Sequence, residues 1–515
     1  MDPTDSAVKN AADRADAARR RSRSCVTELE ILLDRFEARI GWQSQASGLS
    51  AWLREAKKTQ GCLEHLVDEL STASPTDAAA LESIGTRLDA RSVDASHAET
   101  HWDILKRCRS LVAVNRSFQG STRDDRNEHI SNMAVRGRER QLLHRAMKEQ
   151  GKVDVDVVEA GSEWLDIKTL HTDRLLRQMT DSGWAWGDHE IGDPVDAQEW
   201  EDVPLAKHVK RLVAAAKRNR HEYRIPRVRV VLPNIARGIK DIDVLLHRLC
   251  HLDPAVHVII EDQRGHFLGT AAPVVDEAIV NLLGPEFDSL TASLNLDHTI
   301  LIDLSSDITH RRLEAQKWQP ETTRLQIEEE ARHDGFMVKT LYPALDGRTL
   351  VCTKEAAEHF HTILDSVGTS TERARGRLLV PVDEETRKLS QADIRSRFQR
   401  LSIHHLPPAV QIPIRILDEG WDWESVNRAV LQKRLPRVAL DVARCGRLKS
   451  SKLSIYMHGW ASGMTTITSN KEVRGQIRTW LEKNRRHHSD CGPRIWSIGV
   501  TRNLLAKSAT PPAGV

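Results

Sequence analysis

The sequence predicts an α/β protein with an N-terminal helical region, α/β segments and a C-terminal three-layer domain with a mainly parallel sheet. Apolar residues recur at helical spacing through residues 26–115. Short β-branched runs then alternate with amphipathic helical patterns. At 515 residues the chain is too long for one hydrophobic core. We therefore expect four regions: a disordered tail at 1–25, a helical region and linker at 26–138, an α/β middle domain at 151–285 and a C-terminal domain at 290–505.

Composition limits the cellular setting and the partners. The net charge is only +2, so binding of nucleic acid would depend on local basic patches. No apolar run approaches the ~20 residues of a membrane helix, and the N-terminus lacks a signal peptide. The seven cysteines are far apart and form no C-x-x-C pair, which is typical of reduced thiols. We expect no membrane association and a cytoplasmic or nuclear protein, or one present in both compartments.

The N-terminal helices are predicted to pack as a hairpin or small bundle and could contact a protein partner. Residues 117–138 are polar with little periodicity, which predicts a linker. Downstream, the pattern predicts alternating strands and helices. The strands are expected at Val228–Leu232, Val256–Ile260, Leu294–Leu304, Phe336–Leu341, Leu350–Cys352, Leu453–Met457 and Thr465–Thr468, with Arg375–Leu379 leading into another.

A β-hairpin is predicted from the runs Val153–Val158 and Trp164–Ile167. Its first strand carries Asp156, and its second carries Asp166 followed two residues later by Lys168. This arrangement has the shape of a PD-(D/E)xK nuclease core, in which two carboxylates bind a cation and the lysine positions or polarises the nucleophile. The alternative is an ordinary solvent-facing ion pair, because D-x-K arises often by chance in a chain that is 29% charged.

Basic residues are densest near an amphipathic helix predicted at Pro204–Arg218. Such a cluster could contact phosphates, and Tyr223 could stack on a base. The alternative is the solvated face of an amphipathic helix. The candidate nucleic-acid-binding residues are Lys207, Lys210, Arg211, Lys217, Arg218 and Arg220.

Three segments of the C-terminal half carry a resemblance to a known family. They are LNLDHTILIDLSSDITH at 294–310, CTKEAAEHF with GTSTERARGRLLV at 352–380, and ITSNKEVRG at 467–475. In order and spacing they resemble a eukaryotic, fungal-type family that carries domain of unknown function 1308, whose C-terminal half is similar to PIN-like nucleases. The resemblance covers about residues 290–480 and implies a PIN-like domain.

PIN-like nucleases hold Mg²⁺ or Mn²⁺ with acidic side chains at the carboxyl ends of a parallel sheet, because hard cations prefer oxygen ligands. The resemblance implies Asp297 as the principal metal ligand, Glu355 as a second metal ligand or water-positioning residue, and Asn470 as an outer group of the same catalytic site. The fold that the resemblance implies favours nucleic acid as the partner; RNA is the candidate, and the sequence does not distinguish RNA from DNA. Each residue also has a simpler interpretation: Asp297 could cap a turn, Glu355 could favour a helix N-terminus, and Asn470 could be an N-cap.

One departure from the family pattern weakens the catalytic interpretation. Trp460 stands where relatives have an aspartate, and an indole cannot ligate a metal. Asp303 or Asp307 could replace that acid, although an extended strand would place Asp303 about 20 Å from Asp297. Two hypotheses follow: a metal-dependent ribonuclease or RNA-binding protein of this superfamily, or a catalytically impaired member that acts as a binding or scaffold module.

Overall fold

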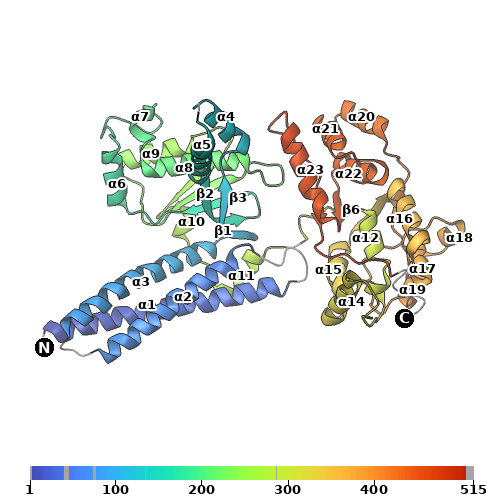
Figure 1. Ribbon diagram of the computed structural model, residues 1–515, viewed down its shortest axis with the longest axis horizontal. Helices are drawn as coiled ribbons and strands as arrows, with labels where there is room; N and C mark the ends of the chain where they lie inside the picture. Colours follow the sequence, from blue (N-terminus) through green and yellow to red (C-terminus); the bar gives the residue numbers. More distant parts are fainter. Residues whose placement is uncertain (1–2, 40–45, 74–76, 134, 286, 506–515) are drawn as a thin grey trace. The chain divides into compact units, whose positions relative to one another are not determined.

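The computed structural model describes residues 3–39, 46–73, 77–133, 135–285 and 287–505. The chain divides into two compact units (Figure 1), the first comprising residues 1–38 and 45–285 and the second residues 39–44 and 286–515. The regions expected separately at 26–138 and 151–285 thus belong to one unit. No helix among the described residues is both long enough and apolar enough to cross a membrane.

The first unit begins with three long helices that pack side by side: α1 (Pro3–Glu37), α2 (Leu49–Thr72) and α3 (Ala78–Leu105). The predicted N-terminal helical region is therefore confirmed. The prediction of a disordered tail at residues 1–25 is wrong, because α1 already spans residues 3–25. Ala15 and Ala18 are fully buried among leucines of α2 and α3. Small alanines carry little hydrophobic signal, so the sequence pattern started the helix too late.

A mixed five-stranded sheet follows, in the order β1-β2-β3-β4-β5. The first three strands form an antiparallel meander, and β4 and β5 continue it in parallel. The strands are β1 (Leu111–Gln119), β2 (Lys152–Glu159), β3 (Glu163–Ile167), β4 (Arg227–Leu232) and β5 (Val258–Asp262).

The linker predicted at 117–138 is wrong, because it contains the end of β1, the helix α4 (Arg123–Ser131) and the start of α5 (Gly137–Gln150). A capping box between Thr122 and Asp125 starts α4, although the helix has little apolar surface. The remaining helices of this unit are α6 (Thr172–Asp181), α7 (Ala197–Trp200), α8 (Pro204–Arg218), α9 (Lys240–Cys250), α10 (His266–Gly269) and α11 (Val275–Leu283).

Helices cover both faces of this sheet (Figure 1). Along β3, Trp164 belongs to the core formed with α6, α8 and α9. Leu165 and Ile167 belong instead to the core shared with α1, α2 and α3. Asp166 follows the alternation of a strand and lies on the same face as Trp164, beneath α8.

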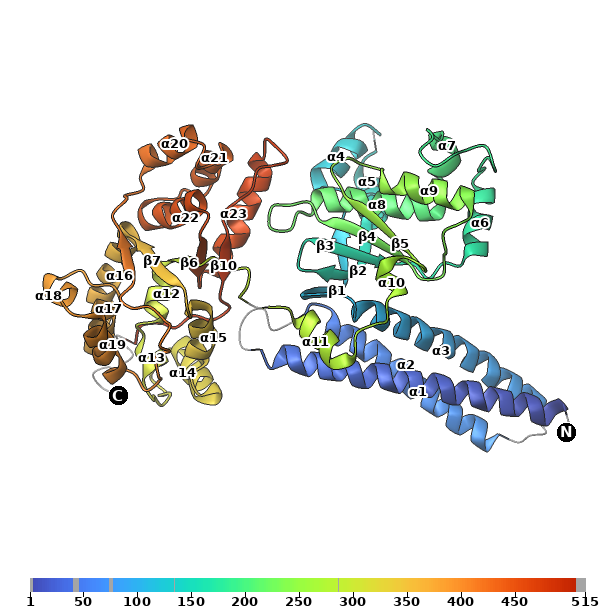
Figure 2. The ribbon, with the colours of Figure 1, turned by 180° about the vertical axis from the view of Figure 1, so that it is seen from behind.

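The second unit contains an all-parallel five-stranded sheet in the order β10-β9-β6-β7-β8. Figure 2 shows its strands between α22 on one side and α15 on the other. The strand order reverses at β6, which lies between β9 and β7. In parallel sheets, binding sites form at the carboxyl ends of strands beside such a reversal. The strands are β6 (Ser293–Leu296), β7 (Thr349–Thr353), β8 (Arg415–Leu417), β9 (Thr465–Thr468) and β10 (Ile495–Ser497).

Twelve helices of the described residues connect and flank these strands. They are α12 (His298–Asp303), α13 (Asp307–His310), α14 (Glu321–His333), α15 (Phe336–Leu345), α16 (Lys354–Val367), α17 (Ser370–Leu379), α18 (Glu384–Arg387), α19 (Gln391–Arg400), α20 (Trp423–Leu431), α21 (Val438–Cys445), α22 (Ser450–Ser462) and α23 (Lys471–Asn484).

Three of the predicted strands in this unit are wrong, and the segment Arg375–Leu379, which was expected to lead into another strand, belongs to a helix. The run Leu294–Leu304 is a strand only to Leu296 and then becomes helix α12, while Phe336–Leu341, Arg375–Leu379 and Leu453–Met457 are helical throughout. Short apolar runs do not distinguish a buried helix from a buried strand, and all three helices lie largely within the core.

Candidate functional site

Asp297 follows β6 directly and acts as the N-cap of α12. Its carboxylate is 2% exposed, and each of its oxygens is held by the protein. Oδ2 accepts hydrogen bonds from Tyr456 (2.9 Å) and Thr468 (2.6 Å), and Oδ1 lies 2.8 Å from Nδ1 of His298. Burial acts to raise the pKa of Asp297, but these hydrogen bonds and the charge of His298 outweigh it and lower the pKa. The carboxylate is thus stable as an anion inside a shell of protein donors.

Glu355 and Asn470 lie at the same end of this sheet as Asp297, and each stands at the start of a helix. Glu355 stands in the first turn of α16, and its Oε1 accepts the backbone N–H of Trp421 at 2.9 Å. Its Oε2 is buried with no hydrogen-bond partner among the described residues. Asn470 is the N-cap of α23 and accepts the N–H of Glu472 at 3.1 Å. The capping interpretation of Asn470 is therefore confirmed.

Trp460 and Asp303 do not complete an acidic cluster. The Trp460 indole lies within α22 and donates to the carbonyl of Cys491 at 3.0 Å. Asp303 lies at the end of α12, where it accepts the N–H of Arg502 (2.6 Å) and the hydroxyl of Thr501 (3.1 Å). Because residues 298–303 are helical, the separation of about 20 Å expected for an extended strand does not apply.

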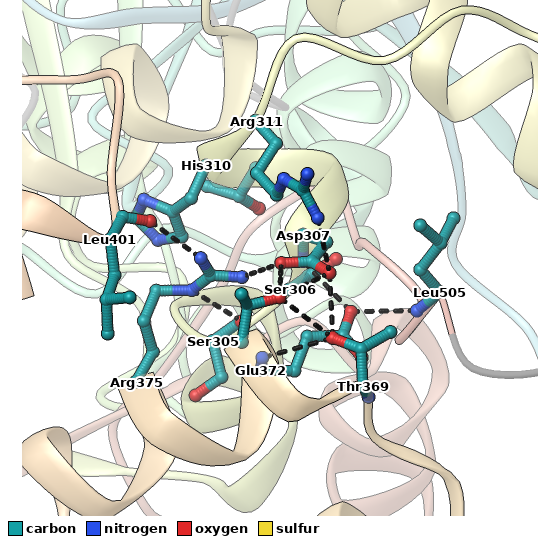
Figure 3. A network of polar contacts seen from close by, with 12 residues as sticks. Ser305, Ser306, Asp307, His310, Arg311, Thr369, Glu372, Arg375, Leu401 and Leu505 are labelled. Carbon is teal, nitrogen blue, oxygen red and sulfur yellow. Dashed lines mark hydrogen bonds and ion pairs between the residues drawn. The ribbon is translucent and has the colours of Figure 1, made fainter. Parts of the chain in front are cut away.

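Asp307 belongs to a buried network that joins distant parts of the second unit (Figure 3). Its carboxylate accepts hydrogen bonds from Thr369 and Thr371, each at 2.7 Å, and pairs with the fully buried Arg375. Burial acts to raise the pKa of Asp307, but the two hydroxyls and the guanidinium lower it below the usual value. Glu372 accepts the backbone N–H of Leu505 at 2.8 Å, which fastens the end of the described chain. The segment GTSTERAR at residues 368–375 therefore stabilises the fold by joining distant parts of the second unit.

The hairpin in the first unit presents a different arrangement. Val157 pairs with Leu165, and continuing this antiparallel register by one residue sets Asp156 opposite Asp166. Asp166 is buried, and Lys168 Nζ lies 3.1 Å from its Oδ1. His208 of α8 places Nε2 3.0 Å from both oxygens of Asp166. Asp156 accepts the backbone N–H of Ile167 at 2.6 Å. The two acids and the lysine predicted from D-x-K are thus brought together.

The tight turn between β2 and β3 fixes this register. Ala160 and Gly161 both have positive φ, at 45° and 68°. A Cβ on Gly161 would lie 1.7 Å from the ring of His221, so only glycine fits this turn without displacing that ring.

A cavity of about 500 Å³ opens at this group. Asp156, Lys168 and His208 line it together with residues from α3 and α6. The further lining side chains that carry polar groups are His97, His101, Thr169, Arg174 and Gln178.

Two ionisable side chains that line the cavity, Asp156 and His101, have shifted pKa values. Burial and the neighbouring charge of Asp166 raise the pKa of Asp156 to about 6. Burial, together with His97 and Lys168, lowers the pKa of His101 to about 4, so this imidazole is neutral at physiological pH. The sequence reasoning missed His101 and His208, because no local motif links α3 or α8 to the hairpin.

The basic residues around α8 are engaged by nearby acids. Lys207 pairs with Asp202 (2.9 Å) and Lys210 with Glu201 (2.6 Å). Lys217 and Arg218 also pair with acids, at 2.6 and 3.0 Å, and Arg211 donates to the carbonyl of Lys152. The structure therefore favours the solvated-face interpretation of these residues, while binding of nucleic acid by them stays a prediction.

Among the described residues, no three acidic, histidine or cysteine side chains converge closely enough to hold a metal ion by themselves. A metal at the hairpin would bind to two carboxylates and complete its coordination with water or substrate oxygens, as Mg²⁺ commonly does. Burial first, and next the charge of Asp166, raise the pKa of Asp156, and a cation at this place would favour the ionised carboxylate. The donor set therefore fits a hard divalent cation.

Comparison with known proteins adds no assignment, because no protein-family model, curated protein or solved structure matches this chain. The candidate sites consequently depend on geometry and chemistry alone.

Proposed function

We propose that this protein is a metal-dependent nuclease whose catalytic centre is the β2–β3 hairpin. The observation that carries the proposal is that Asp156 and Lys168 line a cavity of about 500 Å³ and that Lys168 contacts the buried carboxylate of Asp166 at 3.1 Å. Paired carboxylates beside a lysine, open to a cavity, are suited to hydrolysis of a phosphodiester. The motif was the less favoured interpretation of the sequence, and the geometry raises it to the first.

Each residue has a defined role in this proposal. Asp156 and Asp166 would hold Mg²⁺ or Mn²⁺, which would supply positive charge at the reacting phosphate. Lys168 donates from its ammonium to the phosphate oxygens and opposes their charge as the water oxygen attacks phosphorus. The attacking water gives up a proton to the solvent as its oxygen bonds to phosphorus, the bond from phosphorus to the leaving sugar oxygen breaks, and that oxygen takes a proton from a second water molecule. His208 holds the carboxylate of Asp166 in place from above.

Mn²⁺-dependent cleavage of a labelled single-stranded RNA tests this proposal. The parent should cleave only with the cation, and Lys168→Ala should lose at least about a hundredfold in rate, as typical for loss of one charge-stabilising group. Lys57→Ala, which removes an exposed lysine of α2 that pairs with Glu30, is the matched control and should cleave like the parent. Equal activity of parent and Lys168→Ala would place catalysis elsewhere.

A second candidate function concerns the second unit, which the resemblance describes as PIN-like. The protein donors around Asp297 and the indole at Trp460 favour a catalytically impaired module that binds RNA or a protein partner. The active PIN-like alternative, with Asp297 and Glu355 holding the metal and Asn470 beside them, predicts that Asp297→Asn abolishes cleavage while Lys168→Ala does not.

The seven free thiols fit a reducing compartment, the cytoplasm or nucleus.

A further inference from the structure

Of the two carboxylates of the hairpin site, Asp156 lines the cavity, and Asp166 contacts the lining residues Lys168 and His208. The side chain of Asp166 is only 1% exposed, whereas Lys168 beside it is 33% exposed. Residues from α3, α6 and α8 form the surrounding wall. A reacting phosphate that contacts Asp156 and Lys168 must therefore enter the cavity.

The size of the cavity limits what can accompany that phosphate. A volume of about 500 Å³ is typical of pockets that enclose one small-molecule ligand. A nucleotide is a ligand of this size, whereas a base-paired segment is not. Enzymes that work in such pockets act on single strands or extrude the target nucleotide, which requires that it be unpaired first.

The wall of the cavity also provides groups suited to a base and sugar. His97 and His101 lie one helical turn apart on α3, with ring centroids 4.2 Å apart. Nε2 of His101 and Oε1 of Gln178 are buried and have no hydrogen-bond partner among the described residues. Buried polar atoms are normally paired, so a ligand or water is expected to satisfy them. Lys168 and Arg174 add positive charge for the phosphate.

We infer that the cavity takes one unpaired nucleotide, so that the substrate is single-stranded nucleic acid or an unpaired end, and that the imidazole of His101 contacts the base or sugar. The inference rests on the proposed nuclease function. It assigns substrate recognition to α3, a helix outside the hairpin and outside the D-x-K motif.

The test compares a labelled single strand with the same strand annealed to a blunt-ended complement. Cleavage is measured with Mn²⁺, and binding is measured with Ca²⁺ by fluorescence anisotropy. Each strand is supplied as RNA and as DNA. The single strand should be cut and bound at least roughly tenfold better than the duplex. Equal cleavage of both forms would overturn the inference while leaving the nuclease function in place.

His101→Asn identifies the recognition group. Loss of a contact to one base is worth about 1–3 kcal/mol, so KM for the single strand should rise about five- to a hundredfold with a smaller change in kcat. His65→Asn is the control, because His65 is a 78% exposed histidine on α2. If neither form is cleaved, the nuclease function fails, and the binding arm still decides the inference: preference for the single strand that His101→Asn removes supports it, and absence of that preference overturns it.

Discussion

The two sheets of this protein each place a buried aspartate near a strand end, but the two carboxylates have different surroundings. Asp297 is enclosed by donors from Tyr456, Thr468 and His298. Asp166 is held by Lys168 and His208, and both of these residues also line a cavity. A carboxylate whose oxygens are all occupied by protein donors stabilises the fold. One whose partners face open space can exchange them for a cation and a substrate.

The largest expected difference is between the cleavage rates of two single variants, Asp166→Asn and Asp297→Asn. Asp166→Asn removes one of two charges from the proposed cation site, and cleavage should fall about a thousandfold, equivalent to about 4 kcal/mol. Asp297→Asn should leave the rate per folded molecule near that of the parent. Cleavage of labelled single-stranded RNA with Mn²⁺ measures both. The opposite pattern would return the catalytic centre to the second unit.

The sequence predicted the elements better than the relations between them. The two hairpin strands, α8 and β4 were predicted to within one residue, because β-branched runs and amphipathic spacing are local signals, whereas β1 beside the hairpin was missed. Asp156, Asp166 and Lys168 are also close in sequence, so their convergence could be predicted. His208 and His101 approach the hairpin only after α8 and α3 have packed on the sheet, and no local pattern reports such packing.

The errors in the second unit have a related cause. Asp297 was expected inside a long strand, whereas it ends β6 and caps α12. The apolar residues after it pack against the core as a helix, and a run of that length has no distinguishing periodicity. The donors that enclose Asp297 come from α22 and β9, about 160 residues later in the chain. Whether the acid was structural or catalytic could not be read from the segment itself.

The structural role of Asp297 is tested by stability. An asparagine places an N–H₂ group against the hydroxyls of Tyr456 and Thr468, so at least one buried polar group loses its partner. We expect the free energy of unfolding of the second unit to fall by about 3 kcal/mol. Urea denaturation followed by tryptophan fluorescence measures this change. The exposed N-cap variant Asp422→Asn should cost well under half as much.

Asp303 provides a pH-dependent comparison. Burial raises its pKa to about 7, although Arg502, Ser469 and Thr501 act to lower it. The unfolded carboxyl titrates near 3.8. Because the folded state binds the proton more tightly, the stability from Asp303 is present below pH about 4 and is lost as the pH rises to about 7. The Tm of the parent should fall by several degrees over this interval.

Asp303→Asn serves as the matched variant for that measurement. The amide cannot titrate, so its Tm should vary less between pH about 4 and about 7 than that of the parent. The groups that face Asp303 are the charged Arg502 with its partner Glu330, and the hydroxyls of Thr501 and Ser469. Identical pH dependence of both proteins would show that another group controls the transition.

The smallest expected effect comes from comparing a basic side chain that is paired with an acid and a basic side chain that lines the cavity. Lys210 is paired with Glu201 at 2.6 Å and lies over the ring of Trp200, so Lys210→Ala should change the affinity for single-stranded RNA by less than about twofold. Arg174 lines the cavity, and Arg174→Ala should weaken binding roughly tenfold and reduce its salt dependence. Anisotropy titrations at two salt concentrations measure both variants. A larger loss of affinity from Lys210→Ala than from Arg174→Ala would mean that the strand binds along the basic surface of α8. A substrate confined to the cavity should not depend on Lys210, because this lysine is paired with Glu201.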